Sequence, residues 1–193
     1  MTEVAATGAA QTRPRPAPVA VWDPLVRIVH WGVAAAILAN ATFIEDESLA
    51  HEVIGYTAVG LVIVRLLWGL VGTPHARFSA FPPNPVAAVR HLAGHLSGRH
   101  RRYLSHNPAG ALMAYNLWAT ILGMGITGYM MTTPAYFGIE WVEELHEGLF
   151  AWLMISVVLH LGGVILDSLV TRVPLVAAMI HGKKPVEQSE RTR

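Results

Sequence analysis

The chain has 193 residues, of which 53% are hydrophobic and only 14% are charged, and its formal net charge at pH 7 is +1. Cysteine is absent, which excludes disulfides, thiolate-bound iron–sulfur clusters and the Cys-x-x-Cys-His attachment of c-type haem. This composition indicates an integral membrane protein, and a net charge so close to zero gives no reason to expect a nucleic-acid partner. Any bound metal must be held by other side chains, and ten histidines are available.

The first twenty residues mix small residues, proline and arginine and lack the continuous apolar core of a secretory signal peptide. We expect residues 1–20 to be a disordered tail, followed by one transmembrane domain over residues 21–184 and a second tail over residues 185–193. A helix needs roughly 20 apolar residues to cross a hydrocarbon core of about 30 Å. Four stretches meet that length, and they are predicted to span the membrane at approximately 25–44, 51–71, 109–132 and 144–170.

The long connection over residues 72–108 contains PVAAVRHLAGHL, which is predicted to form an amphipathic helix. It carries His91 and His95 at positions i and i+4, a spacing that can bind a metal. No glutamate accompanies the two histidines in a metalloprotease pattern, and nothing marks a third ligand. We therefore interpret the segment as a basic helix that lies on the headgroups of anionic lipids.

The charges predict the orientation of the chain in the membrane. All fourteen Lys and Arg residues lie in the terminal segments, in the 72–108 connection or in the adjoining parts of the first two spans. The two opposite loops, near residues 45–52 and 140–147, carry eight acidic residues and no Lys or Arg. By the positive-inside rule, the predicted fold is an all-α integral membrane four-helix bundle with both termini cytoplasmic.

Four histidines lie within the predicted spans and sort by depth into two pairs. His51 and His146 begin the second and fourth spans near the outer surface, whereas His30 and His160 lie in the inner halves of the first and fourth spans. Fourteen residues at about 100° each fall only about 40° short of four full turns, so His146 and His160 share one helix face, about 21 Å apart. Ionisable residues inside membrane helices indicate function, and two such pairs favour metal or haem ligation.

A haem suits each pair, because two neutral imidazoles can ligate its iron from opposite sides while its propionates need cationic or polar partners. Arg27 precedes His30 by about one turn, and Arg65 follows His51 by fourteen residues, which places it on the His51 face at the inner level. Both arginines are predicted partners of the inner haem propionates. For Arg65, snorkelling to the cytoplasmic interface is an equal alternative. Iron with two histidine ligands has no open position, which favours electron transfer over oxygen chemistry.

Four segments carry a family resemblance: VWDPLVRIVHW at 21–31, HEVIGYTAVGLVIVRLLWG at 51–69, HNPAGALM at 106–113 and ELHEGLFAWLMISVVLHLGG at 144–163. Together they resemble the bacterial four-helix di-haem cytochrome b561 family, which includes the b-type cytochrome subunits of nickel–iron hydrogenases. The resemblance implies two non-covalent b haems with bis-histidine ligation. The ligands that it implies are His30 and His160 for the inner haem iron and His51 and His146 for the outer one, while the third helix contributes packing only.

The same resemblance implies a multi-pass protein of the bacterial cytoplasmic membrane. Members of the family exchange electrons between membrane quinone and diverse partners, including hydrogenases, soluble c-type cytochromes and, in some cases, superoxide. The outer loop between the first two spans is very short here, so a partner surface built on a longer loop in other members differs in this chain. The acidic outer face can steer a basic redox protein towards the outer haem, although membrane topology alone also explains it.

We therefore expect an electron-transfer protein with no catalytic residue of its own, which leaves open a quinone-linked oxidoreductase activity or a place as a subunit of an oxidoreductase. One alternative is a membrane enzyme with a His-bound non-haem metal, which would need a tight ligand cluster rather than two separate pairs. Another is a proton or metal-ion transporter, which would favour carboxylates within the spans, where only Asp167 lies near the inner end. The remaining histidines are expected on the cytoplasmic surface: His75, His91, His95, His100, His106 and His181.

Overall fold

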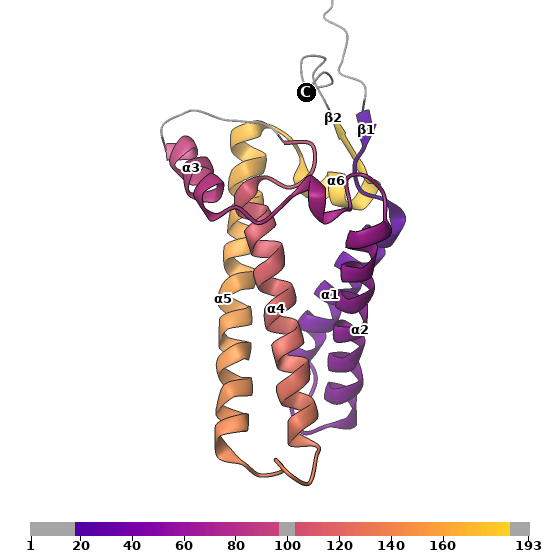
Figure 1. Ribbon diagram of the computed structural model, residues 1–193, viewed down its shortest axis with the longest axis vertical. Coiled ribbons are helices and arrows are strands. Elements are labelled where there is room, and N and C mark those ends of the chain that lie inside the picture. The colour runs from indigo at the N-terminus through magenta and orange to yellow at the C-terminus, as the bar shows by residue number, and fades with distance from the viewer. Residues whose placement is uncertain (1–17, 97–102, 186–193) are drawn as a thin grey trace, which may run out of the picture.

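The computed structural model describes residues 18–96 and 103–185. Its four long helices are α1 (Pro24–Thr42), α2 (Leu49–Val71), α4 (Pro108–Met131) and α5 (Glu140–Thr171). They run along the long axis of the molecule (Figure 1), and each is long and apolar enough to cross a membrane. The predicted all-α four-helix class is confirmed. Helix α5 extends beyond the fourth predicted span at both ends, and the other bounds agree to within a few residues.

Local sequence fixes where three of these helices begin. The carboxylate of Asp23 accepts a hydrogen bond from the backbone N–H of Val26 at 2.9 Å, and the side chain of Asn107 accepts from that of Gly110 at 2.7 Å. In both helices a proline follows the capping residue, where its missing N–H costs nothing. In α2 the hydroxyl of Ser48 accepts from the N–H of His51 at 3.1 Å, so this cap directly sets the position of His51 in the first turn.

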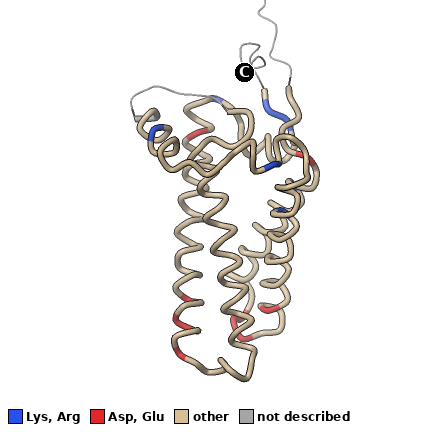
Figure 2. The backbone as a smooth tube through the Cα atoms, in the orientation of Figure 1, with Lys and Arg blue, Asp and Glu red and all other residues tan. Residues whose placement is uncertain are grey.

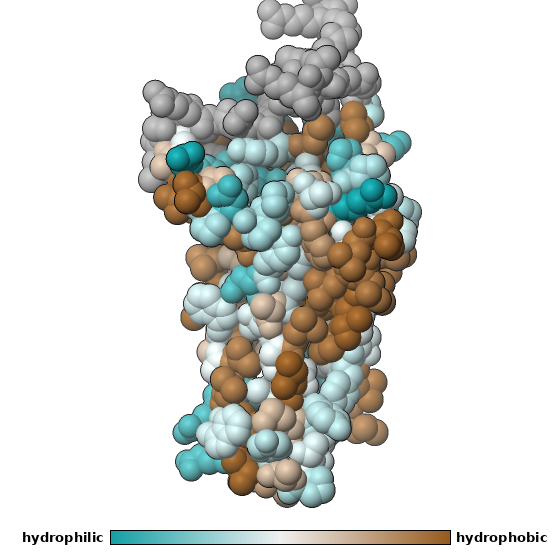
Figure 3. All heavy atoms as spheres, in the orientation of Figure 1, coloured by the Kyte–Doolittle hydropathy of each residue, from teal (hydrophilic) through white to brown (hydrophobic). Residues whose placement is uncertain are grey.

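The helices pack as two antiparallel pairs, α1 with α2 and α4 with α5, and α2 joins the pairs by packing on α4. The centre of the bundle is the buried cluster of Ala58, Val62, Ile121 and Leu153. Gly125 allows α2 and α4 to approach closely, because a Cβ atom there would stand 2.5 Å from the Cγ2 atom of Val59. Hydrophobic side chains gather over the shaft of the bundle in the face that Figure 3 shows, as expected for a surface in contact with lipid.

Short elements cover one end of the bundle: η1 (Phe78–Ala80), α3 (Pro85–Leu96), α6 (Leu175–His181) and a ribbon of strands β1 (Pro18–Ala20) and β2 (Lys183–Pro185). The strands are antiparallel, with Val19 opposite Lys184. All of β1 and the last residue of β2 are expected in the tails, but they form the ribbon because each strand satisfies backbone groups of the other. The other residues of both expected tails lie outside the described residues.

The amphipathic helix expected at residues 85–96 forms as α3 and packs on α4. Its buried face includes Ala88 and His91, while Val86 and Val89 are exposed. The expectation that His91 lies on the surface is wrong: its side chain is buried, and its Nε2 atom lies 4.0 Å from a carboxylate oxygen of Asp167 in α5. The side chain of His95 and all of His100 lie outside the described residues.

Candidate haem-binding sites

Two pairs of histidine rings face each other inside the bundle. The rings of His51 from α2 and His146 from α5 have centroids 6.4 Å apart and an interplanar angle of 62°. The rings of His30 from α1 and His160 from α5 have centroids 6.3 Å apart and an interplanar angle of 53°. The structure therefore brings together the same four residues, in the same two pairs, that depth and helical facing predict.

The spacing of both pairs fits a metal ion between the rings. An iron–nitrogen bond is about 2.0 Å long and an imidazole centroid lies about 1.2 Å from its ring nitrogens, so two rings on opposite sides of one iron have centroids about 6.4 Å apart. A direct N–H···N hydrogen bond of about 2.9 Å would instead bring the centroids to about 5.3 Å. The observed separations of 6.3 and 6.4 Å match the first arrangement and are too wide for the second.

The Nδ1 atoms of the rings differ in their partners. The Nδ1 atoms of His30 and His51 are buried and have no hydrogen-bond partner among the described residues. A hydrogen bond from Nδ1 to a neighbouring side chain therefore does not explain why either histidine is buried here. His146 is different, because its Nδ1 atom lies 2.8 Å from the hydroxyl oxygen of Thr127 in α4.

Arg65 lies at the inner end of α2 and is buried, with a side chain that is only 3% exposed. Its Nη2 atom donates to the carbonyl oxygen of Ala76 at 3.0 Å. The guanidinium carbon lies 5.1 Å from the ring centroid of Trp118 and 5.7 Å from that of Phe81. The side chain thus does not snorkel to the surface, and its buried Nη1 atom, which has no partner among the described residues, remains available to an anion.

A model of the prokaryotic cytochrome b561 family matches residues 21–182 of the chain. The chain belongs to the prokaryotic cytochrome b561 family. The match covers all four long helices, and it makes the protein a di-haem membrane electron carrier whose family binds two b haems through histidines. No curated protein and no solved structure matches the chain. The resemblance of the four sequence segments to this family is confirmed.

Arg27 has a different environment from Arg65. Its Nη2 atom donates to the carbonyl oxygen of Ile180 near the end of α6, which ties α6 to α1. Cations are favourable at this position because helix carbonyls lack partners within the last turn. The Nε atom of Arg27 is buried without a partner in the described part of the chain. One donor of the guanidinium is therefore already used, whereas another is free for an acceptor.

The expectation that His106 is a surface residue is wrong. Its ring is half-buried and packs on Phe81 and Trp22, with centroids 4.5 and 4.8 Å away. Burial, together with the positive charge of Lys184, lowers the pKa of His106 to about 3, so the ring is neutral at pH 7. No local pattern marks this position, because the two rings on which His106 packs come from distant parts of the chain.

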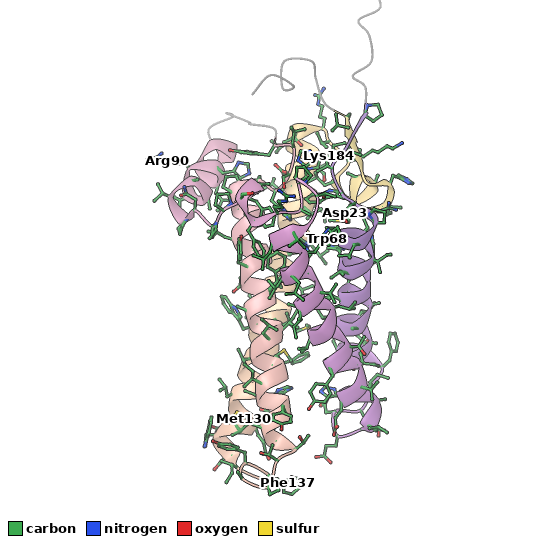
Figure 4. The ribbon with its side chains drawn as sticks, turned by 45° about the vertical axis from the view of Figure 1, so that its right-hand side comes forward. Asp23, Trp68, Arg90, Met130, Phe137 and Lys184 are labelled. Carbon is green, nitrogen blue, oxygen red and sulfur yellow. The ribbon has the colours of Figure 1, made fainter. Side chains whose placement is uncertain are left out.

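Lys184 holds the segment that carries His106 against the terminal ribbon. Its side chain is buried, and its Nζ atom donates to the carbonyl oxygens of Ser105 at 3.0 Å and Tyr103 at 3.4 Å. Burial lowers the pKa of Lys184 to about 8. Figure 4 shows Lys184, Asp23 and Trp68 gathered at one end of the bundle, opposite Met130 and Phe137. The contacts of Lys184 could not be predicted from the sequence, because Tyr103 and Ser105 lie 81 and 79 residues away along the chain.

The described residues also bear on the two alternatives. Within residues 18–96 and 103–185, no group of three or more His, Asp or Glu side chains lies together in a way that could hold a metal ion. Asp167 accepts a hydrogen bond from the side-chain amide of Asn107 at 3.1 Å, at the end of the bundle and not between the histidine pairs. Membership of the family identifies the chain as an electron-transfer protein.

Proposed function

We propose that His51 and His146 ligate the iron of an outer b haem, that His30 and His160 ligate the iron of an inner b haem, and that electrons pass between the two ends of the bundle. The observation that carries this proposal is the spacing of the two ring pairs, at 6.4 and 6.3 Å, with one ligand of each pair supplied by α5. The haems supply reversible one-electron chemistry. With two histidines on each iron, no position is left for oxygen or substrate.

The proposal includes an orientation in the membrane. The described Lys and Arg residues lie at the end that carries the ribbon, and most of the described Asp and Glu residues lie at the opposite end (Figure 2). This distribution supports cytoplasmic termini, with the His30–His160 pair on the cytoplasmic side. The family match, over residues 21–182, supports the further proposal that residues 21–184 form one membrane domain.

We further propose a membrane quinone as one redox partner and a protein with a basic face, such as a hydrogenase or a c-type cytochrome, as the other. Support for the second partner comes from the acidic end of the bundle, where Glu52 adjoins His51 and Glu147 adjoins His146. Opposite charges on the two partners would accelerate their encounter at low ionic strength. Arg65 and Arg27 are proposed partners of the inner haem propionates, because each has a buried guanidinium nitrogen that lacks a partner in the described residues.

The ligand assignment is tested by the visible spectrum and haem content of the purified protein and its variants. The wild-type protein should contain two b haems per chain. His146→Ala should lose one haem and His160→Ala the other, so that their reduced-minus-oxidised spectra differ and add up to that of the wild type. His181→Ala changes an exposed histidine and serves as the control that keeps both haems. A colourless wild-type protein, or the loss of the same haem in both variants, would refute the assignment.

The partner proposal needs a separate measurement. The protein reconstituted in lipid vesicles should be reduced by a quinol added to the membrane and reoxidised by a basic c-type cytochrome added on the acidic side. The rate of the second reaction should fall as salt is added. A rate that does not depend on ionic strength would argue against a basic protein partner and would leave the haem ligands unaffected.

A further inference from the structure

We infer that Thr127 of α4 is a positioning residue for the outer haem: its hydroxyl oxygen accepts the Nδ1 hydrogen of His146 and so holds the ring in the tautomer whose Nε2 lone pair can bind iron. This inference rests on the proposed ligation of the outer haem by His51 and His146. It gives α4 a part in the site, whereas the resemblance assigns the third membrane helix packing only.

Three polar atoms lie within hydrogen-bond distance of the buried hydroxyl of Thr127. The Oγ1 atom of Thr127 lies 2.8 Å from the Nδ1 atom of His146 and 3.1 Å from each of the carbonyl oxygens of Gly123 and Met124. The residue is only 3% exposed, so water does not compete for these contacts. His146 also lies close to α4 beyond the hydroxyl, since a Cβ atom at Gly128 would stand 3.5 Å from its Cε1 atom.

A count of hydrogens selects the tautomer. A threonine hydroxyl has one hydrogen, and a carbonyl oxygen can only accept. When that hydrogen points to the Gly123 or Met124 carbonyl, the hydroxyl oxygen faces His146 as an acceptor, and the imidazole must carry its hydrogen on Nδ1. The reverse arrangement would place the imidazole hydrogen on Nε2, which removes the lone pair that a metal needs, and would leave both carbonyls facing a hydroxyl lone pair.

The hydrogen bond is also expected to change the reduction potential of the haem iron in one direction. An acceptor on the outer N–H of a metal-bound histidine fixes the ring and increases the basicity of its ligating nitrogen. A more basic ligand stabilises ferric iron more than ferrous iron, and it thereby lowers the reduction potential. Thr127 contacts His146, a proposed ligand of the outer haem, so the effect is expected on the outer haem.

The test compares three variants of the full-length protein with both haems bound. Thr127→Val removes the hydroxyl while keeping the shape of the side chain, and Thr127→Ser keeps the hydroxyl. Thr120→Val is a matched control, because Thr120 lies two turns earlier in α4, is equally buried, and donates to the carbonyl oxygen of Asn116 at 2.9 Å in the same i−4 manner. The readouts are the reduction potentials of the two haems in a spectroelectrochemical titration and the electron paramagnetic resonance spectrum of each ferric haem.

We expect Thr127→Val to change the oxidation equilibrium of one haem by about tenfold, which raises its potential by about 59 mV for a one-electron couple. The affected haem must be the one that His146→Ala removes, and Thr127→Ser and Thr120→Val must keep both potentials. The inference is equally supported if Thr127→Val loses that haem and Thr127→Ser keeps it.

Several results would overturn the inference while the proposed function stands. These are unchanged potentials in Thr127→Val, a shift of the other haem, an equal shift in Thr120→Val, or an equally strong disturbance in Thr127→Ser. If Thr127→Val does not fold, Thr127→Ala takes its place under the same criteria. Retention of both haems in His146→Ala would instead refute the ligand assignment itself, whatever Thr127 does.

Discussion

The indole N–H of Trp68, near the end of α2, donates a hydrogen bond of 2.9 Å to the carboxylate of Asp23, which caps the start of α1. The hydroxyl of Thr73 donates to the same carboxylate at 2.7 Å. Burial raises the pKa of Asp23, but the hydrogen bonds from Trp68, Val26 and Thr73 outweigh burial and leave the pKa below its ordinary value. One carboxylate thus begins the first helix, which carries His30, and joins it to the end of the second.

Asp23→Ala should destabilise the inner end of the bundle. The loss of the cap costs about 1 kcal/mol, and each of the two donors left without its acceptor costs roughly 1–3 kcal/mol if it stays buried. Asp23→Asn keeps one acceptor oxygen and should lose less. The measurement is thermal unfolding in detergent, followed by the helical circular dichroism signal. Equal melting temperatures for Asp23→Ala and the wild type would show that neither the cap nor the contacts with Trp68 and Thr73 add stability.

Gly125→Leu should force α2 and α4 apart. A Cβ atom at position 125 already lies within 2.5 Å of Val59, so a larger side chain cannot fit without movement of the helices. Overpacking of this kind costs about 1–3 kcal/mol. Gly60→Ala is the control, because a Cβ atom there meets nothing within 4 Å. The melting temperature should fall for Gly125→Leu, and the additional change Val59→Ala should recover part of the loss. A double variant no more stable than Gly125→Leu would place the clash elsewhere.

The parts of the structure that follow from local rules could be predicted from the sequence. Span length and hydropathy locate the four long helices, and helical periodicity alone places His146 and His160 on one face of α5. The pairing with His51 and His30 follows once the direction of each span is known. These features depend on only one helix at a time, or on the alternation of the spans across the membrane.

Other parts depend on contacts that local patterns do not specify. The pairing of Val19 with Lys184 joins segments 165 residues apart, and neither strand has the length or alternation that would reveal it. The burial of His106 and His91 follows from the way the 72–108 connection folds over the bundle end. The contact of Thr127 with His146 depends on how α4 is rotated against α5, which the nearly uniform apolarity of both helices leaves undetermined.

His106 should make the protein sensitive to acid. Its pKa is about 3 in the folded protein and 6.5 ordinarily, so the unfolded chain binds a proton between these values while the folded chain does not. Stability from this group is therefore complete above pH 6.5 and is lost as the pH falls, at roughly 1.4 kcal/mol per pH unit. His106→Phe keeps an aromatic ring beside Phe81 and removes the titration.

The measurement for His106 is the melting temperature between pH 7 and pH 4. The wild type and the control His181→Phe, which changes an exposed histidine, should lose stability in parallel on acidification. His106→Phe should lose less. Parallel losses in all three proteins would mean that His106 takes up its proton in the folded state and that the acid sensitivity comes from other groups.

Arg65→Met should lower the reduction potential of the inner haem and leave that of the outer haem unchanged. If Arg65 contacts a propionate of the inner haem, as proposed, its positive charge disfavours ferric iron there, so its removal favours the oxidised state, by an amount on the order of 1 kcal/mol. Methionine keeps most of the side-chain volume between Trp118 and Phe81.

Arg77→Met is the matched control, because Arg77 is an exposed arginine at the same end of the bundle. The measurement is a redox titration of both haems in each variant. An inner-haem potential that stays the same in Arg65→Met, or that shifts equally in Arg77→Met, would mean that the Arg65 guanidinium serves only to anchor Ala76 and has no part in the inner site.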